Sequence, residues 1–407
     1  MQSISDLRAF FAARDLSSYD RDNFDRFIKA IRFSFSVPAV HITGTNGKGS
    51  TLNFLKSIYM HAGYKVGTFM SPYFASMNEM IAVGDQHIND KDVLRLFNAQ
   101  EANFLKFQLT SFEIQTYLAF AYLNEQKPDL AIIEVGMGGY LDATNIFTNI
   151  LAIITSVSLE HTNYLGKSVS EIAKSKSGII KDRAPVLVGQ LDESALYAIK
   201  ETAKECRSPL FIVDDYHSDK VEDGITFDYR PYHDLKLNTK AKYQIKNACL
   251  AIEATKILAA TFNVAEDDIR QGLLIEPLAA RYERINEHFL VDGAHNPEAI
   301  DNLIATALET EAKPVHVLFA AFRDKNHSAM LTSLSRDAAS ITLTTFDHKR
   351  ARTKEEYFLY LEEYPFYDDF RLAIVDLREK YPQDIILITG SLYFASLVRH
   401  YLLELKP

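Results

Sequence analysis

The sequence predicts an α/β protein, with a large parallel-sheet domain followed by a smaller α/β domain. Short, continuous apolar runs alternate with amphipathic stretches of helical period, which is typical of parallel strands that are buried on both faces. A glycine-rich segment joins the first of these runs to a helical stretch. A second set of apolar runs begins near residue 285, after a segment that contains Pro277.

The elements follow in order along the chain. Strands of the first domain are predicted at 39–43, 65–70, 130–135, 150–157 and 186–188, and helices at 51–61 and 114–123. Strands of the second, Rossmann-like domain are predicted at 288–291, 315–319, 341–344 and 385–388. The segment 275–284, with one proline and two arginines, is the boundary candidate, so we expect domains at 1–280 and 281–407.

Composition limits the class of protein. A chain of 407 residues with 47% apolar and 24% charged residues is ordinary for a globular protein of two or three domains. The two cysteines, Cys206 and Cys249, fit no disulfide or zinc spacing and indicate a reducing compartment. The N-terminus is charged and no apolar run reaches about 18 residues, so we expect a cytoplasmic protein without a membrane span. A net charge of −10 argues against nucleic-acid binding.

The glycine-rich segment reads Gly44-Thr45-Asn46-Gly47-Lys48-Gly49-Ser50. Glycines let the backbone wrap around phosphate oxygens, and the N-terminus of the following helix offers N–H groups and partial positive charge. The segment therefore favours ATP binding by a P-loop-type domain. The usual spacing G-x-x-x-x-G-K-[ST] is not met, because Ile42 replaces its first glycine and Gly49 follows the lysine. The competing interpretation is a glycine turn with a helix cap.

Polar residues stand at the ends of three other predicted strands. Ser71 follows 65–70, Glu134 lies in 130–135, and His161 follows 150–157. Ligands of open parallel sheets bind at the carboxyl ends of the strands, so these groups could converge on one site. Oxygen ligands suit magnesium, whereas His161 would suit manganese equally well or be a histidine satisfied at a strand end.

The chain resembles the Mur ligase superfamily, and within it the folylpolyglutamate synthase/dihydrofolate synthase family. The loop TGTNGKGS carries the resemblance first, and further motifs agree in order and spacing along most of the chain. They lie at 71–72, 111–113, 134–139, 141–145, 155–156, 160–161, 165–166, 172–180, 292–297, 324–325 and 389–393, with Gln244, Asn247 and Arg281 between them.

The resemblance implies roles for individual residues. The loop from Gly44 to Ser50 would hold ATP, helped from the domain interface by Asn247, Arg281 and Asp292. Ser71, Glu134 and His161 would hold magnesium at two sites, and His295 would lie near the transferred phosphate. Lys176, fifteen residues after His161, matches a lysine that such enzymes carry as a carbamate. Folate would contact Phe112, Glu113, Leu141, Asp142 and Ala143.

The implied reaction is ATP-dependent amide formation between L-glutamate and a folate or dihydropteroate, through an acyl phosphate. Lys48, His161, Lys176 and His295 would be its catalytic residues. The resemblance also implies a monomer in folate biosynthesis and one-carbon metabolism, and is compatible with a potassium ion as a further cofactor.

Five positions depart from the family pattern. Tyr73 and Tyr243 stand where histidine is usual, Met80 and Tyr140 where arginine is usual, and Ser175 where glutamate is usual. If Tyr73, Met80 and Tyr140 line the organic substrate, three basic groups are missing there. A ligase for another carboxylate acceptor is therefore an alternative. A non-catalytic nucleotide-binding paralogue is a second alternative, which the intact Lys48, Glu134, His161 and His295 disfavour.

Overall fold

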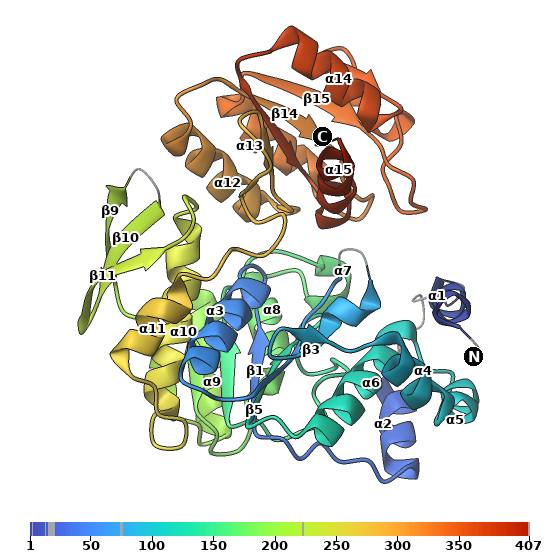
Figure 1. Cartoon of the computed structure of the whole chain (residues 1–407), viewed down its shortest axis with the longest axis vertical. Coiled ribbons are helices and arrows are strands. Elements are labelled where there is room, and N and C mark those ends of the chain that lie inside the picture. The colour runs from blue at the N-terminus through green and yellow to red at the C-terminus, as the bar shows by residue number, and fades with distance from the viewer. Residues whose placement is uncertain (2, 13, 15–20, 74–75, 222–223, 406–407) are drawn as a thin grey trace. The chain divides into compact units, whose positions relative to one another are not determined.

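A computed structural model of the chain describes residues 1, 3–12, 14, 21–73, 76–221 and 224–405. The chain forms two compact units, drawn in Figure 1. The first comprises Met1–His217, Phe227–Lys236 and Ile245–Ile275, and the second comprises Ser218–Thr226, Leu237–Gln244 and Glu276–Pro407. The chain therefore passes from one unit to the other five times. The longest segment of the second unit starts inside the predicted boundary segment 275–284.

The first unit is built on an eight-stranded sheet in the order β4-β3-β2-β5-β1-β6-β7-β8. The pairs from β2 to β8 are parallel, as predicted, whereas β3 and β4 add an antiparallel edge. The strands are β1 (Ala39–Thr43), β2 (Val66–Phe69), β3 (Ile81–Val83), β4 (Gln86–His87), β5 (Leu130–Glu134), β6 (Leu151–Ile154), β7 (Val186–Val188) and β8 (Leu210–Ile212).

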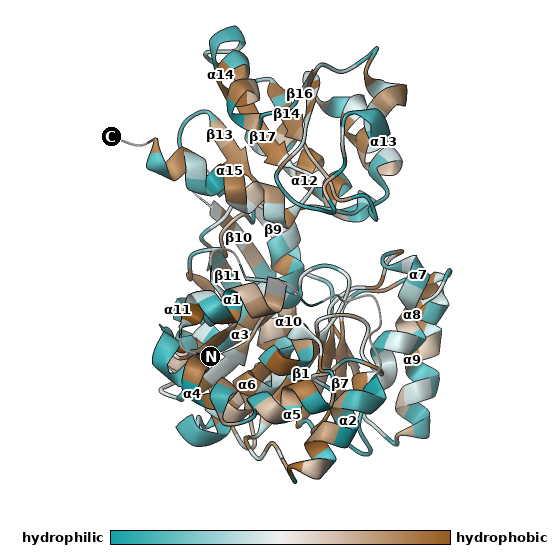
Figure 2. Ribbon diagram, turned by 90° about the vertical axis from the view of Figure 1, so that its right-hand side faces the viewer, coloured by the Kyte–Doolittle hydropathy of each residue, from teal (hydrophilic) through white to brown (hydrophobic). Residues whose placement is uncertain are grey.

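Helices supply the other layers of the first unit. They are α1 (Ile4–Ala12), α2 (Arg21–Ala30), α3 (Lys48–His61), α4 (Asp90–Asn98), α5 (Glu101–Lys106), α6 (Ser111–Gln126), α7 (Thr162–Leu165), α8 (Val169–Lys176), α9 (Glu193–Glu205), α10 (Tyr243–Leu258) and α11 (Glu266–Leu273), with short 3-10 turns at Met77–Met80 and Ser177–Ile179. One apolar core gathers α2, α4, α5 and α6 against the sheet, and another lies under α8 and α9. Figure 2 shows hydrophobic residues along central strands such as β1 and hydrophilic residues on the outer helices. No helix of the described residues is long and apolar enough to cross a membrane.

A small three-stranded sheet was not predicted from the sequence. It has the order β11-β10-β9, with β9 at His217–Val221, β10 at Gly224–Tyr229 and β11 at Tyr232–Leu237. Burial alternates along β10, as expected for a strand with one face in solvent. Such strands lack the continuous apolar runs by which the parallel strands were predicted.

The second unit contains a six-stranded sheet in the order β12-β13-β17-β14-β15-β16. Its inner pairs are parallel, and β12 is an antiparallel edge. The elements are β12 (Glu283–Arg284), β13 (Phe289–Val291), α12 (Pro297–Thr310), β14 (Val315–Phe319), α13 (His327–Asp337), β15 (Ser340–Thr344), β16 (Phe366–Tyr367), α14 (Phe370–Lys380), β17 (Ile385–Thr389) and α15 (Leu392–Glu404), with a 3-10 turn at Glu355–Tyr360. The predicted second α/β fold is confirmed.

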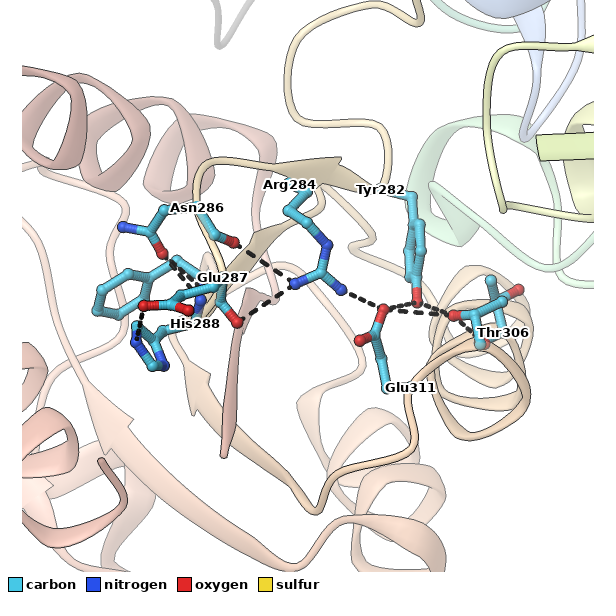
Figure 3. A network of polar contacts seen from close by, with 9 residues as sticks. Tyr282, Arg284, Asn286, Glu287, His288, Thr306 and Glu311 are labelled. Carbon is cyan, nitrogen blue, oxygen red and sulfur yellow. Dashed lines mark hydrogen bonds and ion pairs between the residues drawn. The ribbon is translucent and has the colours of Figure 1, made fainter. Parts of the chain in front are cut away.

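A polar network anchors the short edge strand β12 within the second unit, as Figure 3 shows. The guanidinium of Arg284 pairs with the carboxylate of Glu311 and donates to the main-chain oxygens of Asn286, at 3.4 Å, and Glu287, at 3.5 Å. The hydroxyls of Tyr282 and Thr310 share a hydrogen bond of 2.5 Å. These contacts fix the chain just after Arg281, one of the predicted ATP-binding residues.

Candidate active site

The glycine-rich loop is held against the end of β6 by hydrogen bonds. The N–H groups of Thr45 and Asn46 donate to the main-chain oxygen of Ser156, at 2.9 Å, and to its Oγ, at 2.8 Å. In return, Thr155 Oγ1 donates to the main-chain oxygen of Asn46 at 2.6 Å. Neighbouring strands β1 and β6 thus fix the shape of the loop through side chains that follow β6.

The loop passes into α3 at Gly47, which is the N-cap and has a φ of +86°. A Cβ atom at Gly47 would lie 2.2 Å from Asn247 Oδ1, so both the conformation and the space require glycine. The helix begins at Lys48, earlier than the predicted residue 51. The first-turn N–H groups of Lys48, Gly49 and Ser50 therefore lack helical partners by position, which makes this end of α3 a suitable anion site.

Two lysines lie together beside this helix end. Lys48 Nζ donates to the main-chain oxygens of Gly44 and Thr45, at 3.0 and 3.3 Å. Lys176, the last residue of α8, is only 2% exposed. Burial, and then the charge of Lys48, lower the pKa of Lys176 to about 7, while Glu160 opposes that shift. A large fraction of the Lys176 amine is therefore neutral near pH 7, although lysine is normally charged there.

Ser71 and Glu134 come together at the ends of β2 and β5, which are neighbours in the sheet. The carboxylate of Glu134 is 3% exposed, and its Oε2 accepts a hydrogen bond of 2.9 Å from the main-chain N–H of Ser71. A buried carboxylate next to a serine offers the oxygen ligands that Mg²⁺ prefers. No group of three or more His, Cys, Asp or Glu that could hold a metal is found among the described residues. The pair could supply two oxygen ligands to a magnesium ion, and phosphate and water oxygens would have to supply the others.

His161 follows β6 and is the N-cap of α7, with a φ of +49°. Its Nε2 atom lies 3.4 Å from Oε1 of Glu160, whose side chain is 8% exposed. Glu160 also acts on the pKa of Lys176, so the 160–161 turn lies on the same side of the sheet as Lys176 and Lys48. Glu160 and Lys176 thus lie near the loop, whereas the convergence of His161 with Ser71 and Glu134 stays a prediction.

The predicted folate-contact residues have different environments. Phe112 covers Gly136, where an added Cβ would lie 2.5 Å from the phenyl ring. Leu141 is 57% exposed, whereas Glu113 and Ala143 are buried. Glu113 is occupied as a helix cap: its carboxylate accepts from the N–H of Thr110 at 2.6 Å in a capping box of α6. Contact of Glu113 or Ala143 with folate stays a prediction, and the capping role of Glu113 accounts for its position without one.

Three predicted residues belong to the second unit: Arg281 precedes β12, and Asp292 and His295 follow β13. Asp292 is 4% exposed and accepts hydrogen bonds from the Tyr243 hydroxyl at 2.9 Å, from Tyr282 N at 2.7 Å and from Ala294 N at 2.8 Å. Burial raises the pKa of Asp292, and the nearby Arg281 guanidinium is the largest opposing influence. His295 Nδ1 donates to the main-chain oxygen of Gly293 at 2.9 Å, which fixes the tautomer of the neutral ring.

The departures from the family pattern do not form one group. Met80 is 3% exposed and belongs to the core of the first unit, so it is not a substrate-facing position and its grouping with Tyr73 and Tyr140 is corrected. Tyr73 and Tyr140 are exposed, at 45% and 69%. The N–H of Tyr140 donates to the main-chain oxygen of Ser175 at 3.0 Å, a contact that does not depend on the Ser175 side chain.

Sequence reasoning assigned no role to several residues that build the site. Thr155 and Ser156 were noted as motif residues, but their hydrogen bonds to the glycine loop require the pairing of β1 with β6. Arg21 and His41 reach the segment 140–145 from α2 and β1. Neither lies at a motif spacing, so the sequence held no signal for them.

Comparison with known proteins agrees with this geometry. The family model of the Mur ligase middle domain matches residues 42–255, more than half of the chain, and that of the Mur ligase glutamate ligase domain matches residues 280–392. The chain is 33% identical to a dihydrofolate synthase/folylpolyglutamate synthase of Bacillus subtilis over 387 residues, which cover 89% of this chain and 90% of the relative. It is 32% identical to a folylpolyglutamate synthase of Lacticaseibacillus casei over 386 residues, with the same shares.

Solved structures resemble the whole chain. The apo form of L. casei FPGS superposes with a TM-score of 0.86 at 28% identity, covering 99% of this chain and 100% of that one. An FPGS-AMPPCP-folate complex superposes with a TM-score of 0.87, at the same identity and coverage.

Proposed function

Because this chain belongs to the Mur ligase family, in the branch of the folylpolyglutamate and dihydrofolate synthases, we propose that it joins L-glutamate to a folate by an amide bond, driven by ATP. One observation carries the proposal. The glycine loop with Lys48 follows β1, the Ser71–Glu134 pair lies at the ends of β2 and β5 in the same sheet, and the charge of Lys48 acts on the buried Lys176. A relative of 28% identity has been solved with AMPPCP and folate.

In the first step a carboxylate oxygen of the folate attacks the γ-phosphorus of ATP. A new P–O bond forms, the bond to the bridging oxygen breaks, and ADP leaves an acyl phosphate. Both reactants are anions, so electrostatic repulsion makes up much of the barrier. Lys48 and the N–H groups at the start of α3 supply positive charge to the phosphates. Magnesium, held by Ser71 and Glu134, would neutralise further charge and align the phosphate when bound.

In the second step the amine of L-glutamate attacks the acyl carbon. The C–N bond forms, the tetrahedral adduct loses inorganic phosphate, and the amine nitrogen gives up a proton. Water must be kept out, since it would hydrolyse the acyl phosphate. His295 lies near the transferred phosphate in this proposal. Its Nδ1 donates to the main-chain oxygen of Gly293, so a contact with the phosphate would be made through Nε2.

The same proposal includes a carbamate on Lys176. The neutral amine attacks carbon dioxide, a C–N bond forms, and the nitrogen loses a proton, which leaves a negative carbamate in place of the neutral amine. A pKa of about 7 provides the neutral amine that this reaction needs. The negative group would help to hold a second magnesium ion, and a potassium ion is part of the proposed cofactor set. Labelled bicarbonate should give a carbamate carbon signal by NMR in the native chain and none in Lys176→Arg.

The proposed setting is a cytoplasmic monomer. Its two cysteines, Cys206 and Cys249, are both free thiols, which suits a reducing compartment. Light scattering behind a sizing column would test the monomer, since a mass of twice 46.2 kDa would contradict it.

A phosphate-release assay tests the function directly. We expect release only when ATP, L-glutamate and a folate are all present, with dihydropteroate, tetrahydrofolate and a mono-glutamylated folate compared in parallel. Product with dihydropteroate identifies first-glutamate addition, and product with the mono-glutamylated folate identifies chain extension. Lys48→Ala should reduce the rate by at least about a hundredfold. Phosphate release that ignores both folate and glutamate would overturn the proposal.

A second candidate acceptor is favoured by Tyr73 and Tyr140. Both are exposed where the family usually carries a basic residue, so the grip on an anionic acceptor is weaker at these positions. A panel of other carboxylic acids in the same assay decides between the two. Extension of another acid, with no product from any folate, would assign the chain to that acceptor.

A further inference from the structure

The segment 140–145 has an exposed side and a buried side. Tyr140 and Leu141 are 69% and 57% exposed, whereas Asp142 is 6% exposed and Ala143 is fully buried. The N–H of Asp142 donates to the main-chain oxygen of Gly139 at 3.2 Å, and the N–H of Asn145 donates to that of Asp142 at 3.0 Å. These bonds form two tight turns, which need support from outside the segment to keep one shape.

Support from within the sheet comes through Thr144 and His41. Asp142 Oδ1 accepts from the N–H of Thr144 at 2.9 Å and from its hydroxyl at 2.6 Å, while Oδ2 accepts from Met137 N at 2.9 Å. The single hydroxyl proton of Thr144 is therefore used in the bond to Asp142. In the 2.8 Å contact between Thr144 Oγ1 and His41 Nε2, the imidazole must then be the donor. His41 on β1 is fully buried, and burial lowers its pKa to about 3. The ring is thus neutral, with its proton on Nε2.

Support from the other side comes from Arg21, the first residue of α2. Its Nη1 donates to the main-chain oxygen of Asp142 at 2.6 Å, and its Nη2 donates to that of Asn145 at 3.1 Å. Asp25, one turn along α2, holds Arg21 Nε at 2.7 Å. Lys181 Nζ adds a hydrogen bond of 2.6 Å to the side chain of Asn145. A guanidinium has five donors in a rigid plane, so one side chain can hold several carbonyl groups at once.

We propose that Arg21 and the His41–Thr144 pair are positioning residues for the acceptor substrate: they hold the segment 140–145 in one shape, so that Tyr140 and Leu141 present a fixed surface to the ring system of the acceptor. The inference rests on the proposed function, in which this segment faces the acceptor. Asp142 then stabilises the segment from within, because its two carboxylate oxygens accept hydrogen bonds from Met137 and Thr144. The specificity of the site for its acceptor then depends also on Arg21, His41 and Thr144, which do not touch the acceptor.

Steady-state kinetics of the full-length chain test this inference. Arg21→Gln should raise KM for the folate by about tenfold, because hydrogen bonds from a charged donor are lost. KM for ATP and kcat at saturating folate should stay within about twofold, since the ATP loop is untouched. The KM of Arg21→Lys for the folate should lie between those of the native chain and Arg21→Gln. Arg26→Gln is the matched control, because Arg26 is an exposed residue of the same helix and should leave every constant unchanged. Equal increases in KM for folate and ATP would overturn the inference.

A second pair of variants covers the inner support. Thr144→Val keeps the shape of the side chain but removes the hydroxyl that links His41 to Asp142, whereas Thr144→Ser keeps that hydroxyl. We expect the KM for folate to rise in the valine variant only. A rise of the same size in both variants would overturn the role of the hydroxyl.

Amide hydrogen exchange separates this inference from the proposed function. The amides of Thr144 and Asn145 should exchange at least about tenfold faster in Arg21→Gln than in the native chain or Arg26→Gln, with no substrate present. If the native chain uses no folate but this difference is seen, the proposed acceptor is wrong and the support of the segment stands. If the native chain uses folate and exchange is unchanged, the role of Arg21 is wrong.

Discussion

Burial of Lys176 beside Lys48 disfavours the charged amine in the folded chain. The pKa of Lys176 is lowered from 10.5 to about 7. Between these values the unfolded chain binds more protons at this site than the folded chain, so this lysine makes the free energy of unfolding rise with pH. Below about pH 7 Lys176 is protonated in both the folded and the unfolded chain, and its full destabilisation of the folded chain is present. In bicarbonate-free buffer, the native chain should therefore gain stability relative to Lys176→Met as pH rises from 7 to 9.

Thermal unfolding at several pH values between 7 and 9 measures this difference. Lys174→Met is the matched control, because Lys174 lies on the same helix and is exposed. Its unfolding midpoint should keep a constant offset from that of the native chain. A constant offset for Lys176→Met as well would mean that Lys176 is not buried as an amine.

Single residues were predictable where the fold fixes their place. Ser71 and Glu134 were found because each ends a parallel strand, and neighbouring strands end at one edge. Met80 was grouped with the substrate site by comparison with a family pattern, which carries no information on burial, and it lies in the apolar core. Arg21 acts through carbonyl groups more than a hundred residues away, and no spacing in the sequence encodes such a contact.

The two glycines that flank α3 offer a test at the scale of the element. Gly47 and Gly63 both have a φ of +86°. An added Cβ would meet Asn247 at 2.2 Å from Gly47, but would meet nothing within 4 Å from Gly63. Gly63→Ala should cost about 1–2 kcal/mol of stability, since the left-handed conformation is unfavourable for alanine, and Gly47→Ala should cost more because its Cβ is also crowded. Only Gly47→Ala should also weaken the binding of a non-hydrolysable ATP analogue, by roughly tenfold or more.

Calorimetric titration of the ATP analogue into Gly47→Ala and Gly63→Ala measures its affinity for each variant. Gly63→Ala controls for the backbone strain, because it shares the conformation without the crowding. Equal affinities in the two variants would show that the start of α3 does not hold the nucleotide.

The capping box of α6 allows a similar separation for Glu113. Glu113→Ala leaves the N–H of Thr110 without its acceptor in a buried place, so it should lower the free energy of unfolding by about 1–3 kcal/mol. Glu113→Gln keeps an acceptor oxygen, so its free energy of unfolding in a urea titration should lie close to that of the native chain. If Glu113→Gln unfolds like the native chain but raises KM for folate, Glu113 contacts the substrate as the family resemblance implies.

Elements were predictable in proportion to how continuous their apolar runs are. β14 was predicted with its exact bounds, and β7 likewise, because both are buried on two faces. The start of α3 was placed at residue 51, because a left-handed glycine cap at Gly47 adds a helical turn that hydropathy does not reveal. Strand β10 alternates between buried and half-buried residues, so it lacks the continuous apolar run by which β7 and β14 were predicted.

The whole molecule does not divide at a single peptide bond. Ala241 packs in the core of the second unit, and the Tyr243 hydroxyl donates to the buried Asp292. A fragment of residues 281–407 lacks both and loses a hydrogen bond to a charged group, about 1.5–3 kcal/mol. Its unfolding midpoint should lie roughly 5–15 °C below that of the second unit in the full chain.

Differential scanning calorimetry of the fragment and the full chain measures this shift. Full-length Tyr243→Phe is the comparison that removes the hydroxyl alone, and it should account for part of the loss. A fragment as stable as the intact chain would instead support an independent domain that begins at residue 281, as the sequence suggested.

The five passages between the units also bear on the order in which the chain can fold during synthesis. The first unit includes α11, which packs on α3, and Gly272 comes close to the backbone of Ile58. The N-terminal unit therefore stays incomplete on the ribosome until residue 275 has emerged, although its first strand is made near residue 39. At roughly 5–20 residues per second, synthesis from residue 39 to residue 275 takes about 10–50 seconds. The apolar surface that the later residues cover must stay unaggregated for that time, which makes this unit a natural client for chaperones that bind nascent chains.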